Sequence, residues 1–550
     1  MTPGDLALDD LHRVLRGALS TASHLLTAGE RVIVRRLLAL EGPPGRLWVR
    51  LAARRSASFR QDSISLSDVP DVEEALLELA EHDLVHRSLP WSRVLALLRV
   101  PELKALCRQR GHPVGGRREA LVERLLPEPG PAPIACWRLS GRTLVRRLER
   151  VWFQSGWRDR GTLLLERIGQ VQWVDYPLSA PQRAFERRTQ WRAFEASLHP
   201  AEPERHLQAL QHSTARGPAH RGLDARRYHE RHLAEALREL ERAGEHAEAA
   251  QGYAALLACE PRRPGEHALR LAQCLDKLER PAEGAAVCVK WRARARPEHA
   301  ASLERSGRRL AKKAKGHWRP ARPLLKAPER TLQLPAGPKQ RSRPTWGEPP
   351  LPIERAVLRH CGPRLGEFAE NGLWTTIFGL VCFDLLWLPI PGMLPVPGMD
   401  GPLDLGTAAF MRQRAAPFAE RLEQLRQGLG AEILARHHAQ WGGAQVRGVH
   451  AFPLETLQAV TEACGPALAA VVERLGKEGW SAARGLPDLV FLPGEHGVIP
   501  ELVPSRLPEG LLLVEVKGPT DALRDAQRVW HDRLLRAGLA VEIWKVSPCP

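Results

Sequence analysis

Cysteine is scarce in this sequence and follows no pattern. The 550 residues include nine cysteines, an odd number, and no two of them have Cys-x-x-Cys spacing. Such a distribution argues against a structural zinc site or a disulfide framework, and it favours a reducing compartment.

Long apolar runs are also missing. No stretch reaches the ~18 consecutive apolar residues that suggest a membrane span. The longest candidate, Ile377–Pro391, contains Asp384 and is broken by Pro389. The N-terminal residues show no basic region followed by an apolar run, so the sequence predicts no export signal.

Positive charge is abundant. Lys and Arg number 80 against 63 Asp and Glu, a formal net charge of +17. Such an excess is typical of proteins that bind a polyanion, either nucleic acid or an anionic membrane surface. An Arg-rich, Ala/Leu/Pro-rich composition also arises simply from a GC-rich genome, so charge alone does not decide between these interpretations.

The N-terminal part predicts helices and one short strand. Residues 1 to about 95 have mixed helical patterns, and Arg46–Leu51 reads as a strand followed by Arg54 and Arg55. Around Arg138–Arg160, the arginines are interleaved with Trp137, Trp152 and Trp157, a mixture suited to phosphates and stacked bases.

Pro101–Leu126 predicts a compact helix–turn–helix with its turn at Gly115 and Gly116. Apolar residues recur at helical spacing on both predicted helices, so they can form a small two-helix core. The expected core residues are Leu103, Leu106, Leu121, Val122 and Leu125.

The middle of the chain predicts helical repeats. Residues 226–313 are rich in Ala, Leu, Glu and Arg, and the pattern Leu240-Glu-Arg recurs at Leu278-Glu-Arg. The spacing between these two copies indicates helical-hairpin repeats of tetratricopeptide type. The alternative is a generic helical bundle. Residues 318–352 carry many prolines and predict either a linker or an extended segment lying against the surface.

Near the C-terminus the pattern is strand, strand, helix, strand. Pro487-Asp488 opens one apolar strand, and a second strand ends in Glu515-Val516-Lys517. A predicted helix over Asp521–Leu535 carries Gln527, and Ala540–Val546 forms the last strand. The charged residues therefore gather at the ends of the strands of a small α/β unit.

These residue types suit phosphodiester hydrolysis. Asp488 and Glu515 supply oxygen ligands for Mg²⁺ or Mn²⁺, and the backbone carbonyl of Val516 can complete the metal shell. Glu515 and Lys517 are two apart on a strand, so their side chains share one face. Lys517 can then orient or deprotonate a water, or offset charge in the transition state. Glu-x-Lys alone is a weak motif, and its value lies in the combination with Asp488 and Gln527.

The segment Gly485-Leu-Pro-Asp-Leu-Val490, together with the residues from Leu512 to Val546, resembles the VRR-NUC module of the PD-(D/E)xK nuclease superfamily. The resemblance extends over most of the chain and points to the Fanconi-associated nuclease family in a bacterial form. It implies a multidomain, mainly α-helical protein in which helical N-terminal, SAP-like and tetratricopeptide-like regions precede an α/β nuclease core. The expected regions are 1–95 (N-terminal DNA-binding), 96–135 (SAP-like hairpin), 136–225 (basic, Trp/Arg-rich, DNA-binding), 226–317 (repeats), 318–352 (linker) and 353–550 (VRR-NUC).

The same resemblance implies further site residues. Glu370, in Phe368-Ala-Glu-Asn-Gly372, matches an upstream metal-binding glutamate, although this segment departs from the usual Gly-Glu-Gly-Ser pattern. Basic residues that match the family's DNA-binding and 5′-phosphate-binding regions are Arg50, Arg54, Arg55, Lys104, Arg117 and Arg118.

For activity, the resemblance implies a 5′-flap endonuclease and 5′→3′ exonuclease that acts in interstrand-crosslink repair with Mg²⁺ or Mn²⁺. We expect a cytoplasmic monomer that associates with the nucleoid when bound to DNA and has no ubiquitin-binding zinc finger, since no cysteine precedes Cys107. The alternatives are a Holliday-junction resolvase or restriction-like nuclease, and a non-catalytic DNA-repair scaffold.

Overall fold

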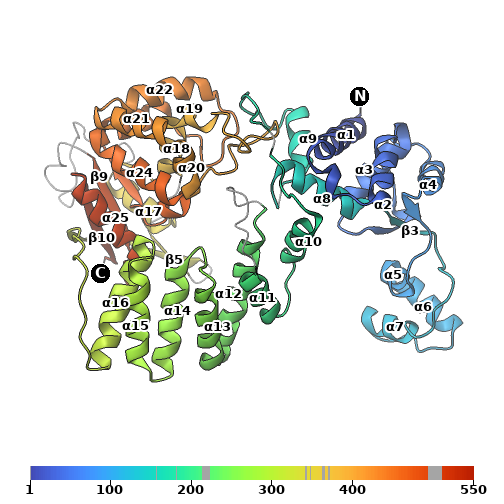
Figure 1. Ribbon diagram of the computed structural model, residues 1–550, viewed down its shortest axis with the longest axis horizontal. Helices are drawn as coiled ribbons and strands as arrows, with labels where there is room; N and C mark the ends of the chain where they lie inside the picture. The colour runs from blue at the N-terminus through green and yellow to red at the C-terminus, as the bar shows by residue number, and fades with distance from the viewer. Residues whose placement is uncertain are drawn as a thin grey trace. The chain divides into compact units, whose positions relative to one another are not determined.

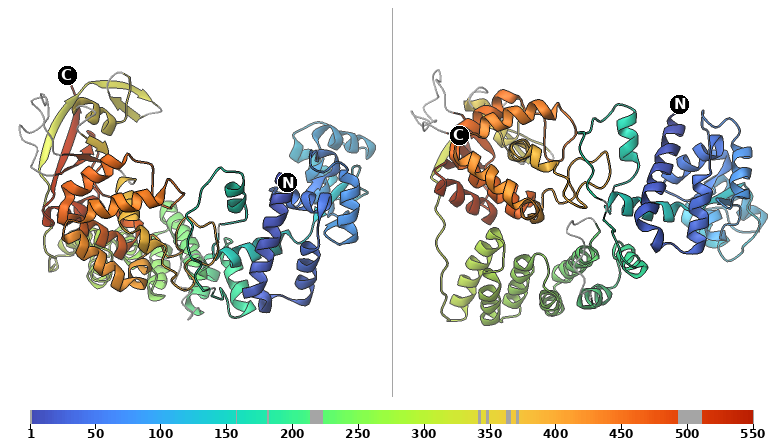
Figure 2. Two further views of the ribbon diagram at one scale, coloured as in Figure 1. Left: turned by 90° about the horizontal axis from the view of Figure 1, so that it is seen from above. Right: turned by 45° about the horizontal axis from the view of Figure 1, so that its top comes forward.

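The chain folds into two compact units in the computed structural model (Figures 1 and 2). The structure describes residues 2–156, 158–180, 182–212, 223–340, 343–346, 349–361, 366–369, 372–492 and 511–549. The first unit comprises Met1–Val171 and Pro181–Glu195, and the second comprises Gln172–Ala180 and Ala196–Pro550. No helix in the described ranges is both long and apolar enough to cross a bilayer.

The first unit is built from helices around a small antiparallel sheet. Its strands lie in the order β1 (Ser58–Arg60), β3 (Cys136–Leu139), β2 (Val85–His86). Helix α1 (Pro3–Ala22) packs against α3 (Gly42–Ala53) and α8 (Arg142–Phe153) through buried leucines and valines. This unit also contains α2 (Ala28–Leu38), α4 (Val72–Glu81), α9 (Gly161–Arg167) and α10 (Arg188–Ser197), and three further helices, described below, lie between β2 and β3 in the chain.

The strand expected over Arg46–Leu51 is wrong, because these residues lie in the middle of α3. Prolines occupy the first helical turn, where a missing N–H costs nothing and the fixed φ suits the helix. Leu47, Trp48 and Leu51 are buried at helical spacing, while Arg50 is exposed. A short apolar run is ambiguous between helix and strand by periodicity alone, and here the preceding prolines were the better signal.

The predicted helix–turn–helix is confirmed. Helices α6 (Val100–Gln109) and α7 (Arg118–Leu125) form the hairpin, and Gly116 in the turn has a φ of +107°, which favours glycine. A further helix, α5 (Trp91–Leu97), packs on them and was not predicted. Of the expected core residues, Leu103, Leu106, Leu121 and Leu125 are buried, and Val122 packs against them half-buried.

The predicted helical repeats form a row of antiparallel helices in the second unit, seen in green in Figure 1. Each helix contacts the next, and α14 also contacts α16, as in stacked helical hairpins. A continuous core that includes Leu233, Tyr253, Leu271 and Cys288 runs through the row. The helices are α11 (Pro203–His212), α12 (Ala225–Ala243), α13 (His246–Ala258), α14 (Pro264–Lys277), α15 (Pro281–Arg292) and α16 (Pro297–Lys313).

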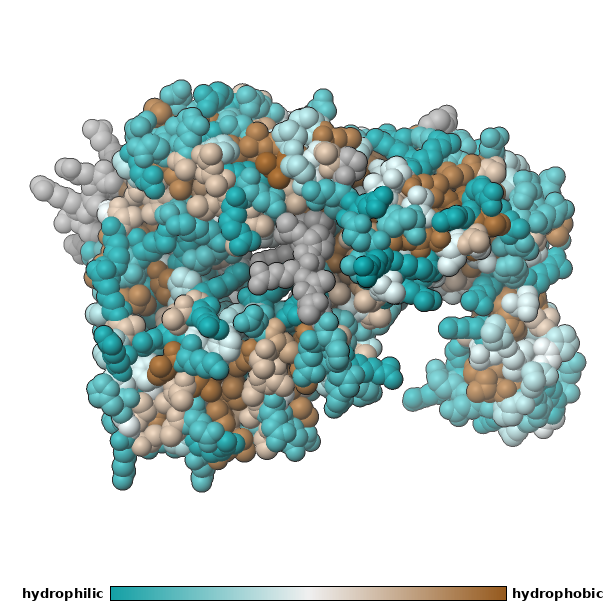
Figure 3. All heavy atoms as spheres, viewed as in Figure 1, coloured by the Kyte–Doolittle hydropathy of each residue, from teal (hydrophilic) through white to brown (hydrophobic). Residues whose placement is uncertain are grey.

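The visible face of the molecule is largely hydrophilic (Figure 3), and apolar residues gather most clearly over α13–α15. These helices bury alanine and leucine against one another, so part of the apolar surface seen there belongs to the seams between stacked helices.

A second group of helices precedes and covers the five-stranded sheet formed by the C-terminal strands. Every residue of α18 (Leu373–Val381) is buried, which explains the longest apolar run in the sequence. Nearby, Arg414 and Asp404 form a fully buried ion pair at 2.7 Å. The other helices are α17 (Ile353–Cys361), α19 (Phe383–Leu386), α20 (Ala408–Gln413), α21 (Ala415–Arg426), α22 (Gly430–Trp441), α23 (Leu454–Cys464) and α24 (Leu468–Glu478).

A five-stranded mixed sheet holds the C-terminal motif residues. Its order is β4 (Glu329–Leu334), β10 (Ala540–Pro548), β9 (Leu512–Lys517), β8 (Leu489–Phe491), β7 (Gly366–Phe368). Strand β10 is parallel to both neighbours, and β8 is antiparallel to β9 and β7. The predicted succession of strand, strand, helix, strand is therefore confirmed, with α25 (Asp525–Arg536) connecting β9 to β10.

The proline-rich segment is more than a linker. It contains β4, which pairs along its whole length with β10, and the hairpin of β5 (Ala336–Gln340) and β6 (Arg343–Trp346). Leu332 and Leu334 enter the same core as Val514 and Val516. Of the two predicted alternatives, a linker or an extended segment lying against the surface, the extended segment agrees better with the structure. A strand at the edge of a sheet tolerates the prolines that follow it.

Candidate active site

Asp488 and Glu515 meet where β8 begins and β9 ends. The antiparallel register pairs Leu489 with Val514, which places the preceding Asp488 beside Glu515. The backbone N–H of Val516 donates to Asp488 Oδ2 at 2.9 Å. Both strands are nearly continuous apolar runs, typical of strands buried on both faces, so the carboxylates are held at the edge of a rigid core.

Glu515 is completely buried, and its two oxygens have different surroundings. Oε1 lies 2.7 Å from the ammonium of Lys517 and accepts a hydrogen bond from the side-chain amide of Gln527. Oε2 has no hydrogen-bond partner among the residues the structure describes, and Nε2 of His531 lies 3.9 Å from it. A buried carboxylate oxygen without a partner is costly, so this oxygen is suited to a cation.

Burial and the neighbouring charge of Glu515 raise the pKa of Asp488 to about 8. The Val516 N–H and Lys517 oppose the shift, while Glu354 on α17 adds to it. Two carboxylates this close compete for one proton unless a positive ion joins them. Asp488 and Glu515 are hard oxygen donors, so the donor set fits Mg²⁺ or Mn²⁺.

The side chains of Lys517 and Val516 point as their strand positions predict. Lys517 is on the same face as Glu515 and is 12% exposed, while the Val516 side chain is buried in the core with Phe491 and Trp544. Only the backbone of Val516 is therefore available to the site.

Helix α25 carries Gln527 and a residue that the sequence interpretation missed, His531. Both are buried, and they lie one turn apart on the face towards Glu515. The signal was the i, i+4 spacing from Gln527 on an already predicted helix. The oxygen of the Gln527 amide accepts from the N–H of Arg524 at 2.8 Å, which caps the helix and leaves the amide nitrogen to donate to Glu515.

Gly485 lets this helix approach the Asp488 loop. Its φ is +107°, and a Cβ placed there would lie 2.7 Å from the backbone carbon of Ala526. Any larger residue would push the first turn of α25 away, so the glycine is required by both its conformation and the close contact.

Glu370, expected as a further metal ligand, lies outside the described residues. The residue before it, Ala369, donates its N–H to the Asp488 carbonyl at 2.8 Å, and β7 pairs with β8 just ahead of it. Within the described part of the chain, no third His, Cys, Asp or Glu completes a metal-ligating group around Asp488 and Glu515.

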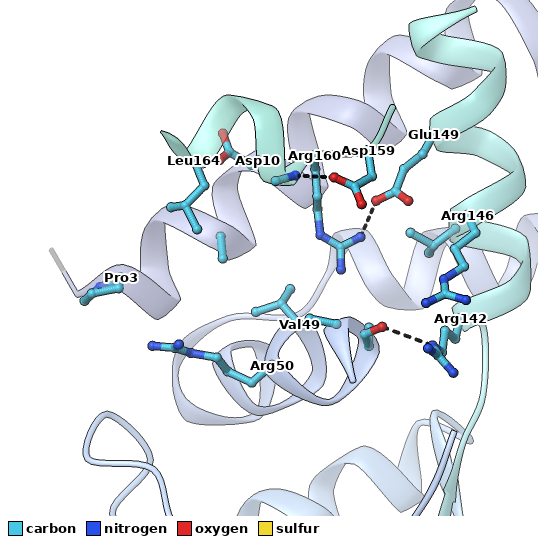
Figure 4. A pocket seen from close by; sticks show the side chains of 15 residues that line it. Pro3, Asp10, Val49, Arg50, Arg142, Arg146, Glu149, Asp159, Arg160 and Leu164 are labelled. Atoms are coloured by element: carbon cyan, nitrogen blue, oxygen red, sulfur yellow. Dashed lines mark hydrogen bonds and ion pairs between the residues drawn. The ribbon is translucent and has the colours of Figure 1, made fainter. Parts of the chain in front are cut away.

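The basic residues expected to bind DNA in the N-terminal region have different surroundings in the structure. Arg50 lines a cavity of about 260 Å³ in the first unit, together with Arg142, Arg146 and Arg160 (Figure 4). Three carboxylates also line this cavity, and Arg160 is paired with one of them, Glu149. The positive and negative charges around the cavity are therefore nearly balanced. Arg54 and Arg55 do not line it; their carbonyls accept hydrogen bonds from Arg142.

In the SAP-like hairpin, the three basic residues expected to bind DNA also differ in their exposure and hydrogen bonds. Lys104 is half-buried on α6, and Arg117 is exposed where α7 begins. The guanidinium of Arg118 instead donates to the carbonyls of Ala96 and Leu98, at 2.8 and 2.6 Å. Arg118 therefore caps the C-terminal end of α5 and has fewer donors left for a ligand.

Three family models match the chain. They are the VRR-NUC domain at residues 427–548, the FAN1 HTH domain at 7–86 and the SAP domain at 94–127. Curated relatives named Fanconi-associated nuclease 1 homolog align over almost the whole sequence. Over nearly its whole length the chain is therefore similar to Fanconi-associated nucleases.

Among these family members, the Arabidopsis thaliana protein is 27% identical over 97% of this chain and 66% of its own length. The Oryza sativa protein is 25% identical, with 62% of its length covered, so this chain spans about two thirds of the plant relatives. The Pseudomonas aeruginosa member is 27% identical over 92% of this chain and 89% of its own length.

The fold is also shared with a solved structure. A crystal structure described as paFAN1 bound to DNA with a 2-nucleotide 5′ flap and a gap superposes with a TM-score of 0.80 at 23% identity, covering 100% of this chain and 99% of that one. The mainly helical organisation with a SAP domain and a C-terminal VRR-NUC domain is thereby confirmed.

Proposed function

We propose that this chain is a structure-specific DNA nuclease that hydrolyses phosphodiester bonds with a divalent metal ion, as a 5′-flap endonuclease and a 5′→3′ exonuclease. One observation carries the proposal. Glu515 is completely buried beside Asp488, with Lys517 and Gln527 on one oxygen and no hydrogen-bond partner within the described residues on the other.

Mg²⁺ or Mn²⁺ would be held by Asp488, Glu515 and the Val516 carbonyl, with Glu370 as a further ligand. Bound there, the ion supplies a nucleophilic water and neutralises charge on the phosphate. Gln527 holds Glu515 in place by donating to the oxygen that Lys517 also contacts. That arrangement leaves the other oxygen without a hydrogen-bond partner among the described residues, so it could bind the ion.

Lys517 is the residue proposed to act on the reacting groups. Its ammonium is fixed by Glu515 at 2.7 Å and is mostly shielded from solvent, so its charge acts in a low-dielectric setting. From there it can orient the attacking water and stabilise the negative charge that develops in the transition state. The presence of all four residues disfavours a non-catalytic scaffold with a decayed site.

The substrate is proposed to be 5′-flap and related branched DNA, in interstrand-crosslink repair, with the protein acting as a monomer in the bacterial cytoplasm and at the nucleoid. The net charge of +17 supports a polyanionic partner. The flap specificity comes from the family relative whose crystal structure holds such a DNA. A resolvase of the same core would act as a symmetric dimer, whereas this chain carries its own helical domains ahead of the nuclease sheet.

The basic N-terminal residues are proposed to bind DNA. Exposed Arg50 and Arg117 and half-buried Lys104 have the exposure that phosphate contacts require, and a 5′ phosphate is the expected ligand near Arg50, Arg54 and Arg55. Because the cavity beside Arg50 also contains Asp10, Glu149 and Asp159, it favours an anion only weakly. If Arg54 and Arg55 bind the 5′ phosphate outside this cavity, Arg54→Ala/Arg55→Ala should weaken cleavage of 5′-phosphorylated flaps more than of unphosphorylated ones, and an equal loss on both would exclude the phosphate role.

The test of the activity is a cleavage assay on a labelled 5′-flap DNA with Mg²⁺, Mn²⁺ or a chelator. We expect cleavage near the flap junction with either metal, none with chelator, and none by Asp488→Ala. Undiminished cleavage by Asp488→Ala, or no cleavage of any branched DNA by the wild type, would refute the proposal.

A further inference from the structure

The first turn of α25 is held from three sides. Gln527 ties it to Glu515, and Gly485 packs directly against the backbone of Ala526. The third side is helix α16, the last helix of the repeat row, which lies below α25 in Figure 1 and contacts it.

The contact with α16 centres on Asp525, the first residue of α25. Its carboxylate Oδ2 accepts a hydrogen bond from the hydroxyl of Ser302 and lies 2.8 Å from the guanidinium of Arg305, both on α16. The Asp525 side chain is only 9% exposed. The stability of such a shielded carboxylate depends on its partners more than that of a surface carboxylate does. At a helix N-terminus its negative charge is also stabilised by the helix dipole.

The geometry ties this contact to Glu515 through two residues of one helical turn. Asp525 and Gln527 lie in the first turn of α25, and the Gln527 amide must accept from Arg524 N–H and donate to Glu515 at the same time. If the turn shifts, both bonds of that amide change together. Glu515 would then lose the donor that fixes its orientation beside Lys517.

We infer that Arg305 and Ser302 are positioning residues for the nuclease site, and that the helical repeats serve catalysis by fixing the first turn of α25. This inference rests on the proposed nuclease function. Arg305 acts through Asp525 and Gln527, and its ion-pair partner is Asp525 rather than Asp488 or Glu515. Helix α16 thus belongs to the support of the site as well as to the repeat row.

The test compares two arginines of α16. Arg305 is 63% exposed and pairs with Asp525 at 2.8 Å, whereas Arg309 is 58% exposed and pairs with Asp276 of α14 at 2.7 Å. Arg305→Ala and Arg309→Ala therefore each remove one similar ion pair from the same helix. We expect Arg305→Ala, and more strongly Ser302→Ala/Arg305→Ala, to lower kcat on flap DNA by about tenfold or more with KM unchanged, because a misplacement of about 1 Å can cost roughly a hundredfold.

Arg309→Ala should leave kcat unchanged, and Arg305→Lys should restore most of the loss. Equal effects of Arg305→Ala and Arg309→Ala would overturn the inference. So would a rise in KM at unchanged kcat, which would make Arg305 a DNA contact instead.

A second measurement does not depend on cleavage. Hydrogen exchange of the peptide covering α25 should be faster in its first turn in Ser302→Ala/Arg305→Ala than in Arg309→Ala. Unchanged exchange there would overturn the positioning role even if activity fell. Conversely, a wild type that cuts no DNA would refute the proposed function while the exchange comparison still reports on the contact.

Discussion

The two carboxylate oxygens of Glu515 have different roles in the candidate active site. One is fixed by Lys517 and Gln527, and the other has no hydrogen-bond partner within the described residues. The orientation of this carboxylate is therefore set by protein donors, and the remaining oxygen is left for a ligand that the side chains do not supply.

Lys517→Ala should separate binding from chemistry. We expect affinity for flap DNA in chelator to be retained while kcat falls by about a hundredfold or more, because the charge near the reacting phosphate is lost. Lys545→Ala is the matched control, since Lys545 is the partner of Lys517 in the β9–β10 register but is 55% exposed and paired with Glu329. Loss of DNA binding with unchanged turnover per bound complex would contradict the catalytic role.

Residue types at fixed spacing could be predicted from the sequence because the chemistry itself restricts them. Asp488, Glu515 and Lys517 come together as expected, and Gln527 faces them. His531 shares a helix face with Gln527 through its i, i+4 spacing, whereas Glu354 has no spacing that distinguishes a site residue from a surface residue. Only the packing of α25 and α17 brings them near the carboxylates.

At the scale of single elements, the type of secondary structure was hardest to predict for short apolar runs. Residues 46–51 form a helix because prolines start α3 and burial is on one helical face. Strand β4 was hidden among prolines, and its partner β10 is distant in sequence, so no local pattern could reveal the pairing. By contrast, the α6–α7 hairpin was predictable because its core is local.

The hairpin offers a direct comparison of adjacent arginines. Arg118→Ala should lower the free energy of unfolding by about 1–3 kcal/mol, because the carbonyls at the end of α5 lose a charged donor. Arg117→Ala removes an exposed charge and should leave stability unchanged. Thermal or urea unfolding checks both, and equal stability of the two variants would show that the capping contact contributes nothing.

The N-terminal end of α2 should show a pH dependence. Hydrogen bonds from Arg188, and from Thr27 at the helix N-terminus, lower the pKa of Glu30 from 4.5 to about 2. A carboxyl whose folded pKa is depressed stabilises the fold above the unfolded value, and this contribution is lost as the pH falls from 4.5 towards 2. Glu30→Gln should therefore be less stable than the wild type at neutral pH, and the difference in Tm should shrink across that range. A difference that stays constant with pH would contradict the ionic origin.

For the whole molecule, the charge balance determines how DNA should bind. We expect affinity for flap DNA to fall by about a thousandfold or more between roughly 50 and 200 mM salt, because phosphate contacts release counterions. Lys104→Ala and Arg117→Ala should each reduce the slope of log K against log salt by about 1. Fluorescence anisotropy over a salt series measures both, and a flat response would exclude a backbone-dominated footprint.

The pairing of β4 with β10 also constrains how this protein is made. A strand near residue 330 must wait for a strand near residue 543 before its edge is covered, and β10 also completes β9, which carries Glu515. During synthesis the nuclease sheet therefore stays open, with unpaired edges prone to aggregation, long after the helical repeats have been made. A shortened chain that stops before β10 would carry every proposed catalytic residue, yet β4 and β9 would lack the strand that lies between them, so we expect such a chain to be inactive.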